Sequence, residues 1–330
     1  MTSGHRDRRT PHRGRRHRDA PPRHRRARGS TALRRRPTAG STGARRERVI
    51  HRALRRLPAV LVALVGIGLL LYPSAGNWFA ARAHAASTNS YVAAVDQLPQ
   101  PDREAALRRA REYNARIGVQ TLTDPYTDVE EVQATSAEYD NQLRVDGAEA
   151  MARIRIPTID VRLPVFHGTS EETLTAGVGH LQGSSLPVGG ADTNAVLTGH
   201  SGLANATLFT DLHRVAAGDL LFVDVLGETL AYRVDLIETV LPTETDLLRV
   251  VADTDLLTLV TCTPIGVNSH RLVVRAERVE LPEAAEAAAE VSTQTQGVPF
   301  PWWLVGAGGA VLTGTVVLLV PPRRRTDGGS

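Results

Sequence analysis

The sequence predicts a mostly β domain, a closed or nearly closed barrel of short strands, flanked by two membrane-spanning helices. Three observations predict it. Short alternating segments separated by turn residues follow Met151, an uncharged apolar run extends from Leu57 to Phe79, and a second apolar run extends from Trp302 to Val320. Many short strands with turns between them are typical of β-barrels. Each apolar run is about long enough to cross ~30 Å of hydrocarbon as a helix.

Residues 1–56 are dominated by Arg, Pro, Gly, Ser and His, and hold 20 Arg against 3 acidic residues. Such a composition cannot bury enough apolar surface to fold, so we expect a disordered segment. Because a membrane segment follows at once, the arginines favour a cytoplasmic tail on anionic lipid headgroups, with nucleic-acid contact as the alternative. The middle of the chain is acidic, which argues against a nucleic-acid enzyme.

The first membrane helix is expected over residues 57–79. Arg55 and Arg56 flank its inner end, and Tyr72 and Trp78 suit the outer interface. Small residues after the run would also fit a signal-peptide cleavage site. The apolar run is longer than a usual signal core, which favours an uncleaved anchor.

The second membrane helix is expected over residues 301–321, with two tryptophans at its start and the arginine run 323–325 beyond its end. A buried core helix is the alternative, and the arginine run argues against it. Residues 322–330 then form a cytoplasmic tail, and the segment between the two helices lies outside the cell. Residues 282–300, rich in Ala, Glu, Thr and Gln, are expected to form a linker.

Residues 80–150 are expected to hold a helix followed by a turn. Apolar residues recur there at helical spacing and form one stripe: Ala106, Ala110, Tyr113 and Ile117. By itself the later Asp124-Pro125-Tyr126 reads as a turn, because proline presets the backbone.

The barrel is expected over residues 151–281. Ala152 to Ile156 alternates strictly and stops at Pro157, as a strand does. Further strand signals lie at 192–198, 220–225, 229–240, 256–261 and 271–280.

Cys262 is the only cysteine, which excludes an intramolecular disulfide and a Cys-rich zinc site. It ends a strand rich in Leu, Thr and Val, just before Thr263-Pro264. A thiol at the end of a rigid strand is well placed as a nucleophile, and His200 upstream is a candidate partner. A small buried hydrophobe is the alternative, and an unpaired thiol outside the cell argues against it.

Three motifs resemble sortases, the cysteine transpeptidases of Gram-positive cell surfaces. Thr258-Leu259-Val260-Thr261-Cys262 is similar to the family's TLxTC signature, the segment 197–203 resembles the part that carries its histidine, and 269–275 resembles the strand that carries its arginine. The three occur in the family's order, within roughly 154–279. The resemblance implies the eight-stranded sortase barrel, with Cys262, His200 and Arg271 as the catalytic residues.

Asp124, Pro125 and Tyr126 resemble the Asp-Pro-aromatic lid of class C, pilus-building sortases. In that class the acid and the ring occupy the catalytic cleft at rest. Tyr126 departs from the usual Phe or Trp but keeps an apolar face. The resemblance implies that Asp124 lies near Arg271 and that the ring covers the thiol, so that lid opening gates activity.

The resemblance also implies the reaction. A thioester at Cys262 would form when an LPxTG-like sorting signal is cleaved between Thr and Gly, and an amine would then take the acyl group. No cofactor is implied. The acceptor would be a lysine of the next pilin. A housekeeping sortase, which attaches surface proteins to the cell wall, is the alternative with the same chemistry. A non-catalytic surface assembly or adhesion module is the alternative from another class.

Several other polar residues are expected to have no catalytic role. Arg275 lies on the same strand face as Arg271 and is the second candidate for the arginine. The acidic pairs Glu171-Glu172 and Asp253 with Asp255 offer oxygens that calcium accepts, but the class C resemblance implies no metal, so we expect solvated surface. Three histidines lie in no motif of this chemistry and are expected to be structural or exposed: His167, His180 and His213.

Overall fold

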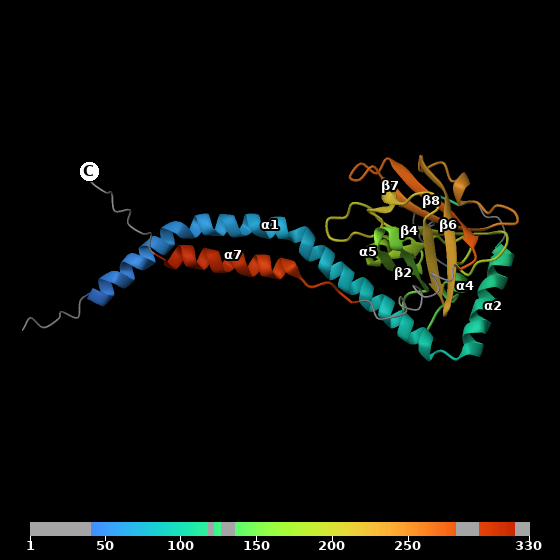
Figure 1. The fold of residues 1–330 in the computed structure, drawn as a ribbon, viewed down its shortest axis with the longest axis horizontal. Helices are drawn as coiled ribbons and strands as arrows, with labels where there is room; N and C mark the ends of the chain where they lie inside the picture. The colour runs from blue at the N-terminus through green and yellow to red at the C-terminus, as the bar shows by residue number, and fades with distance from the viewer. Residues whose placement is uncertain (1–40, 118–121, 127–135, 282–296, 321–330) are drawn as a thin grey trace, which may run out of the picture. The chain divides into compact units, whose positions relative to one another are not determined.

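The computed structural model describes residues 41–117, 122–126, 136–281 and 297–320 of the 330-residue chain (Figure 1). Parts of four predicted segments lie outside the described residues. These are residues 1–40 of the tail, 118–121 and 127–135 around the turn, 282–296 of the linker, and the terminal tail.

The centre of the chain is a barrel of eight strands: β1 (Ala152–Ile156), β2 (Val161–His167), β3 (Val178–His180), β4 (Thr193–Thr198), β5 (Leu220–Val225), β6 (Glu228–Val240), β7 (Asp255–Thr263) and β8 (His270–Val279). The barrel closes in the order β1-β2-β3-β4-β7-β8-β6-β5. Neighbouring strands are antiparallel except for β2 with β3 and β4 with β7, which are parallel. The closed barrel that the strand pattern predicted, and the eight strands that the family resemblance implied, are confirmed.

Six of these strands lie where alternating residues predicted them, and two carried no prediction. Pro164 sits inside β2, opposite Arg153 of β1, and a proline normally argues against a strand because it cannot donate to the ladder. The other missed strand, β3, has only three residues. A segment that short shows no measurable alternation.

Apolar side chains from the strands fill the barrel interior. Ile154 of β1 lies opposite Val223 of β5, and Leu259 of β7 lies opposite Val274 of β8. All four side chains are fully buried and belong to one core cluster. Burying such a side chain contributes about 1.5–3 kcal/mol, so the closed barrel is a rigid support for residues at its edge.

Two long helices precede the barrel. Helix α1 (Ser41–Gln97) contributes Tyr91 and Val95 to the core cluster of the barrel. Helix α2 (Gln100–Ile117) buries residues of the predicted apolar stripe, which confirms that helix. Helix α1 begins at Ser41, inside the segment 1–56 that was expected to be disordered. Arginine and alanine propagate a helix well once the adjoining segment has formed one.

Among the described residues, four shorter helices connect strands, and a fifth precedes β1. The α-helices are α4 (Ala137–Asp140) and α5 (Glu171–Ala176), and the 3₁₀-helices are Pro157–Ile159, Leu212–Arg214 and Asp246–Leu248. Helix α5 packs on β3.

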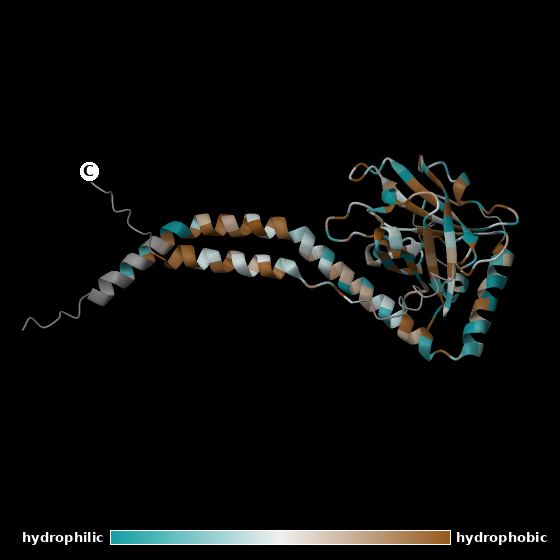
Figure 2. Cartoon of the chain, viewed as in Figure 1, coloured by the Kyte–Doolittle hydropathy of each residue, from teal (hydrophilic) through white to brown (hydrophobic). Residues whose placement is uncertain are grey.

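In the described part of the chain, two helices are long and apolar enough to cross a membrane. They are Ala53–Gln97 within α1, and α7 (Trp302–Leu319). Figure 2 shows apolar residues along both helices. Their large apolar side chains stay exposed, with Leu70 at 80% and Leu312 at 67% exposure. Such exposure is typical of a lipid-facing helix and not of the core helix of a soluble domain.

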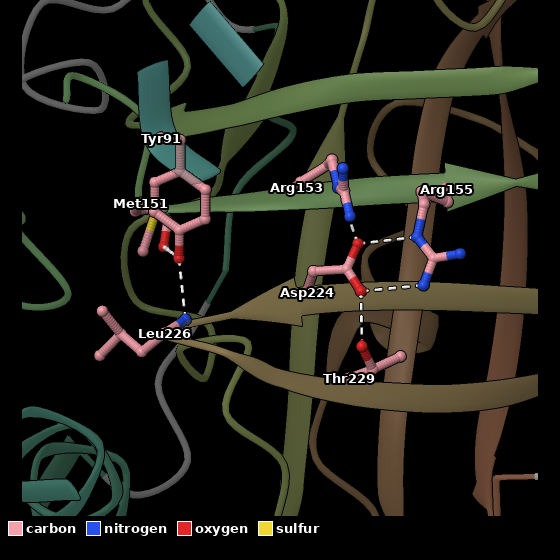
Figure 3. Close-up of polar contacts among 7 residues, drawn as sticks. All are labelled: Tyr91, Met151, Arg153, Arg155, Asp224, Leu226 and Thr229. Carbon is pink, nitrogen blue, oxygen red and sulfur yellow. Dashed lines mark hydrogen bonds and ion pairs between the residues drawn. The ribbon is translucent and has the colours of Figure 1, made fainter. Parts of the chain in front are cut away.

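The end of α1 is fixed to the barrel by the hydroxyl of Tyr91. It donates to the carbonyl of Met151 at 3.1 Å and accepts from the backbone N–H of Leu226 at 2.9 Å (Figure 3). Tyr91 is 3% exposed. The helix therefore enters the domain as part of its core.

Beside this contact lies a buried ion cluster. Asp224 of β5 accepts from Nε of Arg153 at 2.8 Å and from Nε and Nη2 of Arg155 at 2.7 and 2.9 Å (Figure 3). The hydroxyl of Thr229 donates to the same carboxylate at 2.7 Å. Burial alone would raise the pKa of Asp224, but the two guanidinium groups and this hydroxyl outweigh it and lower the pKa.

Candidate active site

The pairing of β4 with β7 brings two distant segments to one edge of the barrel. The strands run parallel, with Thr198 beside Val260, and the N–H of Gly199 donates to the carbonyl of Val260 at 3.2 Å. Because parallel strands end at the same edge, His200 just after β4 and Cys262 near the end of β7 are carried to the same place.

The antiparallel pairing of β7 with β8 supplies the third residue. Cys262 lies directly opposite Arg271, and the two side chains are 8% and 9% exposed. The three residues that the sequence singled out therefore gather at one edge, although they span His200 to Arg271 in the chain.

The surroundings of Cys262 favour the neutral thiol. Burial raises its pKa, the positive charge of Arg271 lowers it, and the carboxylate of Asp124 raises it, with a net upward shift. Ser201, which follows His200, donates its hydroxyl to the carbonyl of Cys262 and so ties the two segments together. In this conformation the site holds the less nucleophilic form of the sulfur.

Asp124 contacts Arg271 directly. Its Oδ1 lies 2.7 Å from Nε, and its Oδ2 lies 2.7 Å from Nη2, so the carboxylate uses both prongs of the guanidinium. Asp124 is 7% exposed. A bidentate, buried pair of this kind is strong and directional, and it occupies Nε and Nη2 of Arg271.

Tyr126 covers the other side of the site. Its hydroxyl donates to the carbonyl of Gly199 at 2.6 Å and to that of Val260 at 3.2 Å. The ring lies 5.8 Å from the ring of His200, and the guanidinium of Arg271 lies over it at 4.9 Å. Burial is the largest cause that raises the pKa of the hydroxyl. The neutral Tyr126 is thus held as a hydrogen-bond donor.

Leu122, two residues before Asp124, was missed by the sequence reasoning. It is 9% exposed and joins a small apolar cluster against which Tyr126 packs, with Leu181, Val196, Leu248 and Val260. Its only sequence signal is an apolar residue just before the Asp-Pro turn. The segment 122–126 is therefore held by apolar packing, hydrogen bonds and an ion pair.

His200 is 17% exposed at its side chain, and its Nε2 lies 3.5 Å from Oε2 of Glu171. The Nε2 atom is buried and makes no hydrogen bond to any described residue. Glu171 was predicted to be solvated surface. Its side chain is indeed 82% exposed, but its carboxylate faces the imidazole.

Comparisons with known proteins agree with this arrangement. A family model for the sortase domain matches residues 154–279. The crystal structure of sortase C-1 from Actinomyces oris shows 47% identity and a TM-score of 0.50, over 54% of this chain and 98% of that one. The chain belongs to the sortase family.

Two further matches describe how this sortase relates to others. A Streptococcus pneumoniae sortase C structure, described in terms of catalysis and pilin substrate specificity, shows 39% identity and a TM-score of 0.54 over 57% of this chain and 94% of that one. Sortase A of Bacillus anthracis is 29% identical over 137 residues, 41% of this chain. That match spans 62% of the length of the Bacillus anthracis protein.

The other arginine candidate of this sortase is engaged elsewhere. Arg275 forms an ion pair with Asp235, with side-chain exposures of 24% and 33%. It lies opposite Thr258, four residues from the contact of Arg271 with Cys262. Its guanidinium is thus bound at the outer surface of the barrel.

The remaining polar residues have structural contacts. His180 is fully buried between the hydroxyl of Tyr139 and the carbonyl of Ser185, each at 2.8 Å, and burial lowers its pKa to about 4. Asp255 was predicted to be solvated, and that is wrong. Its carboxylate is 14% exposed and accepts from the N–H of Gly190 and from the hydroxyl of Tyr232.

His167 and His213 each bond a backbone carbonyl, that of Gln142 and that of Thr210. Among the described residues, no three His, Cys, Asp or Glu side chains are grouped to hold a metal ion.

Proposed function

We propose that this chain is a membrane-anchored class C sortase that polymerises pilins through a thioester at Cys262. The observation that carries the proposal is the site at the barrel edge. Cys262 lies opposite Arg271, His200 follows the neighbouring parallel strand, and Asp124 and Tyr126 fill the space before them.

In the first half-reaction, the thiol proton of Cys262 passes to His200, and the resulting thiolate attacks the carbonyl carbon of the threonine in an LPxTG-like sorting signal. Negative charge develops on the carbonyl oxygen, and Arg271 stabilises it, because a guanidinium is always charged and presents paired donors. His200 gives a proton to the glycine nitrogen as the peptide bond breaks. The products are a thioester on Cys262 and a free amino-terminal glycine fragment.

In the second half-reaction, the lysine amine of the next pilin attacks the thioester carbonyl. His200 accepts the proton that the amine loses, an amide bond forms, and the Cys262 sulfur leaves. Arg271 again holds the charged oxygen. The first half-reaction uses the thiol proton of Cys262, and the second returns a proton from the amine. The thiol and the imidazole are therefore regenerated, and no cofactor is needed.

The segment 122–126 favours a pilus-building enzyme over a housekeeping one. Asp124 occupies both prongs of Arg271, and Tyr126 lies over His200, so a sorting signal must displace both. Such a lid suits an enzyme that is active only with a substrate that can displace the lid. The likeness to the Streptococcus pneumoniae sortase C, described in terms of pilin substrate specificity, supports the same class.

The two apolar helices support a membrane location. The arginine-rich residues 1–56 precede the apolar run 57–79 of α1, and the arginine run 323–325 follows α7 in the sequence. Because arginine-rich flanks stay in the cytoplasm, both termini are cytoplasmic and the barrel is extracellular, where sorting signals arrive.

The test is a product analysis with the full chain in detergent micelles, an LPxTG peptide and a lysine-containing acceptor peptide. We expect a new peptide joined through the lysine side chain, and none with Cys262→Ala. Release of the free threonine acid alone would show a hydrolase, and ligation by Cys262→Ala would show that the site is elsewhere. Either result would overturn the proposal.

A further inference from the structure

The carboxylate of Glu171 is the acidic group that faces the imidazole of His200 within the described part of the chain. Oε2 of Glu171 lies 3.5 Å from Nε2 of His200. That nitrogen is buried and makes no hydrogen bond to a described residue. The ring of Tyr126 covers the imidazole from another side, 5.8 Å away. The carboxylate of Glu171 therefore approaches a ring nitrogen that accepts or donates no hydrogen bond within the described part of the chain.

The backbone of Glu171 is fixed by its surroundings, although its side chain is exposed. Ser170 caps α5, because its hydroxyl accepts from the N–H of Thr173 at 3.2 Å. Leu174 of the same helix is 2% exposed. A Cβ on Gly179 of β3 would lie 2.9 Å from Leu174, so helix and strand are in close contact. Since β3 pairs with β4, α5 is held against the strand that leads to His200.

We propose that Glu171 is a positioning residue for His200, a role that rests on the proposed function and deepens it. Its carboxylate attracts the imidazolium and orients the ring, which leaves the other ring nitrogen for proton transfer at the cleft. An acid that orients a catalytic histidine through its far nitrogen is a recurring arrangement in nucleophilic enzymes.

This role has a kinetic consequence. His200 must carry a proton to release the glycine amine and must accept one from the incoming amine. Glu171 stabilises the charged ring in both steps without touching either peptide. Loss of its charge should therefore slow the chemistry of both half-reactions and leave the KM for each peptide unchanged. Because the carboxylate of Glu171 is exposed to solvent, its effect is moderate, about fivefold.

The test uses the full chain in detergent micelles and three variants. Glu171→Gln keeps the shape and removes the charge, and Glu171→Asp keeps the charge. Glu172→Gln is the matched control, because Glu172 is also exposed in the first turn of α5 and forms no ion pair with His200. Thioester formation on Cys262 is timed by mass spectrometry without an acceptor, and transfer is timed after an amine is added.

We expect Glu171→Gln to lower the rate of both steps about fivefold at unchanged KM, and Glu171→Asp to recover part of the loss. Glu172→Gln should equal the wild type. The difference between the wild type and Glu171→Gln should shrink at high salt, because salt screens exposed charges.

Three results would overturn the inference. They are wild-type rates in Glu171→Gln, an equal loss in Glu172→Gln, or a change confined to the KM of the amine, which would make Glu171 an acceptor contact. A wild-type protein that forms no thioester contradicts the proposed function itself, so the two failures are distinguishable.

Discussion

Asp124 and Arg271 lie 147 positions apart in the sequence, yet they form a buried ion pair with two N–O distances of 2.7 Å. The pair joins the segment before the barrel to the strand opposite Cys262. It has two effects on the sulfur, since Asp124 adds a negative charge and also holds the guanidinium that would favour a thiolate. In this conformation Asp124 occupies both Nε and Nη2 of Arg271.

The first prediction concerns the reactivity of Cys262. Burial and Asp124 raise the pKa of the thiol and Arg271 lowers it, so Asp124→Ala should lower that pKa. The thiolate then forms at a lower pH, and the profile of iodoacetamide labelling against pH shifts toward acid. At pH 7 we expect labelling at least about threefold faster.

Cys262 is the only cysteine, so labelling reports on it alone. Asp235→Ala is the control, because it removes the partner of Arg275 at the surface. A profile for Asp124→Ala that overlays the wild-type profile would contradict the role of the lid.

The second prediction concerns the hydroxyl of Tyr126, a group that a Phe or Trp lid lacks. Tyr126→Phe keeps the ring but loses the bonds to the carbonyls of Gly199 and Val260. A neutral hydrogen bond contributes about 0.5–1.5 kcal/mol, so the lid should open up to about tenfold more often. Labelling of Cys262 should rise accordingly, with Tyr126→Ala faster still. Equal labelling rates of Cys262 in the wild type and Tyr126→Phe would show that the hydroxyl does not stabilise the closed lid.

The sequence predicted the fold well because strand alternation is a local signal. The edges of β5 and the apolar stripe of α2 follow directly from side-chain periodicity. The proline within β2 and the three residues of β3 carry no such signal, and only closure of the barrel makes them strands. The composition of residues 41–56 is typical of a disordered segment. These residues are helical in the structure, where they continue the helix formed by the adjoining apolar segment.

The site residues that belong to a motif could be predicted from the sequence. Those that join the site only through contacts between different helices and strands could not. The resemblance placed Asp124 near Arg271, and the structure shows that contact. Neither Leu122, which packs near Tyr126, nor Glu171, which lies beside His200, belongs to a sequence motif. The sequence alone does not show whether an exposed acidic residue faces an imidazole or only solvent. Asp255 also looked like surface, and its partners come from other strands. The catalytic roles of Cys262, His200 and Arg271 stay predictions.

The third prediction separates the two arginines of β8. Arg271→Ala should slow thioester formation about 10²- to 10³-fold, because it removes the donor for the developing oxyanion. Arg275→Ala should stay within about twofold of the wild type, because its guanidinium is bound to exposed Asp235. Timed mass spectrometry of Cys262 with a sorting peptide measures both. The reverse order of effects would assign the role to Arg275.

The fourth prediction concerns stability and pH. The lowered pKa of Asp224 means that it stays ionised in the folded protein below the pH at which it protonates in the unfolded chain. Its stabilisation is therefore complete above about pH 4 and is lost as the pH falls through the lowered folded value. Asp224→Asn should cost about 3 kcal/mol of unfolding free energy at pH 7, because Arg153 and Arg155 lose the carboxylate they share.

The deficit of Asp224→Asn should shrink as the pH drops below about 4, where the wild type loses the same charge. Denaturant unfolding at several pH values measures it. Asp246→Asn is the control, since its pair with Arg249 is 85% exposed at the aspartate and should have little effect. A deficit independent of pH would show that the charge of Asp224 is not the stabilising feature.

The central claim is that Cys262 is an acylating nucleophile held shut by Asp124 and Tyr126. The most direct measurement is intact-mass spectrometry of the full chain with an LPxTG peptide, for the wild type and for the double variant Asp124→Ala, Tyr126→Ala. The account predicts a thioester on Cys262 that accumulates faster in the double variant and disappears when an amine is added. No thioester in either protein, or one formed equally fast in both, would contradict it.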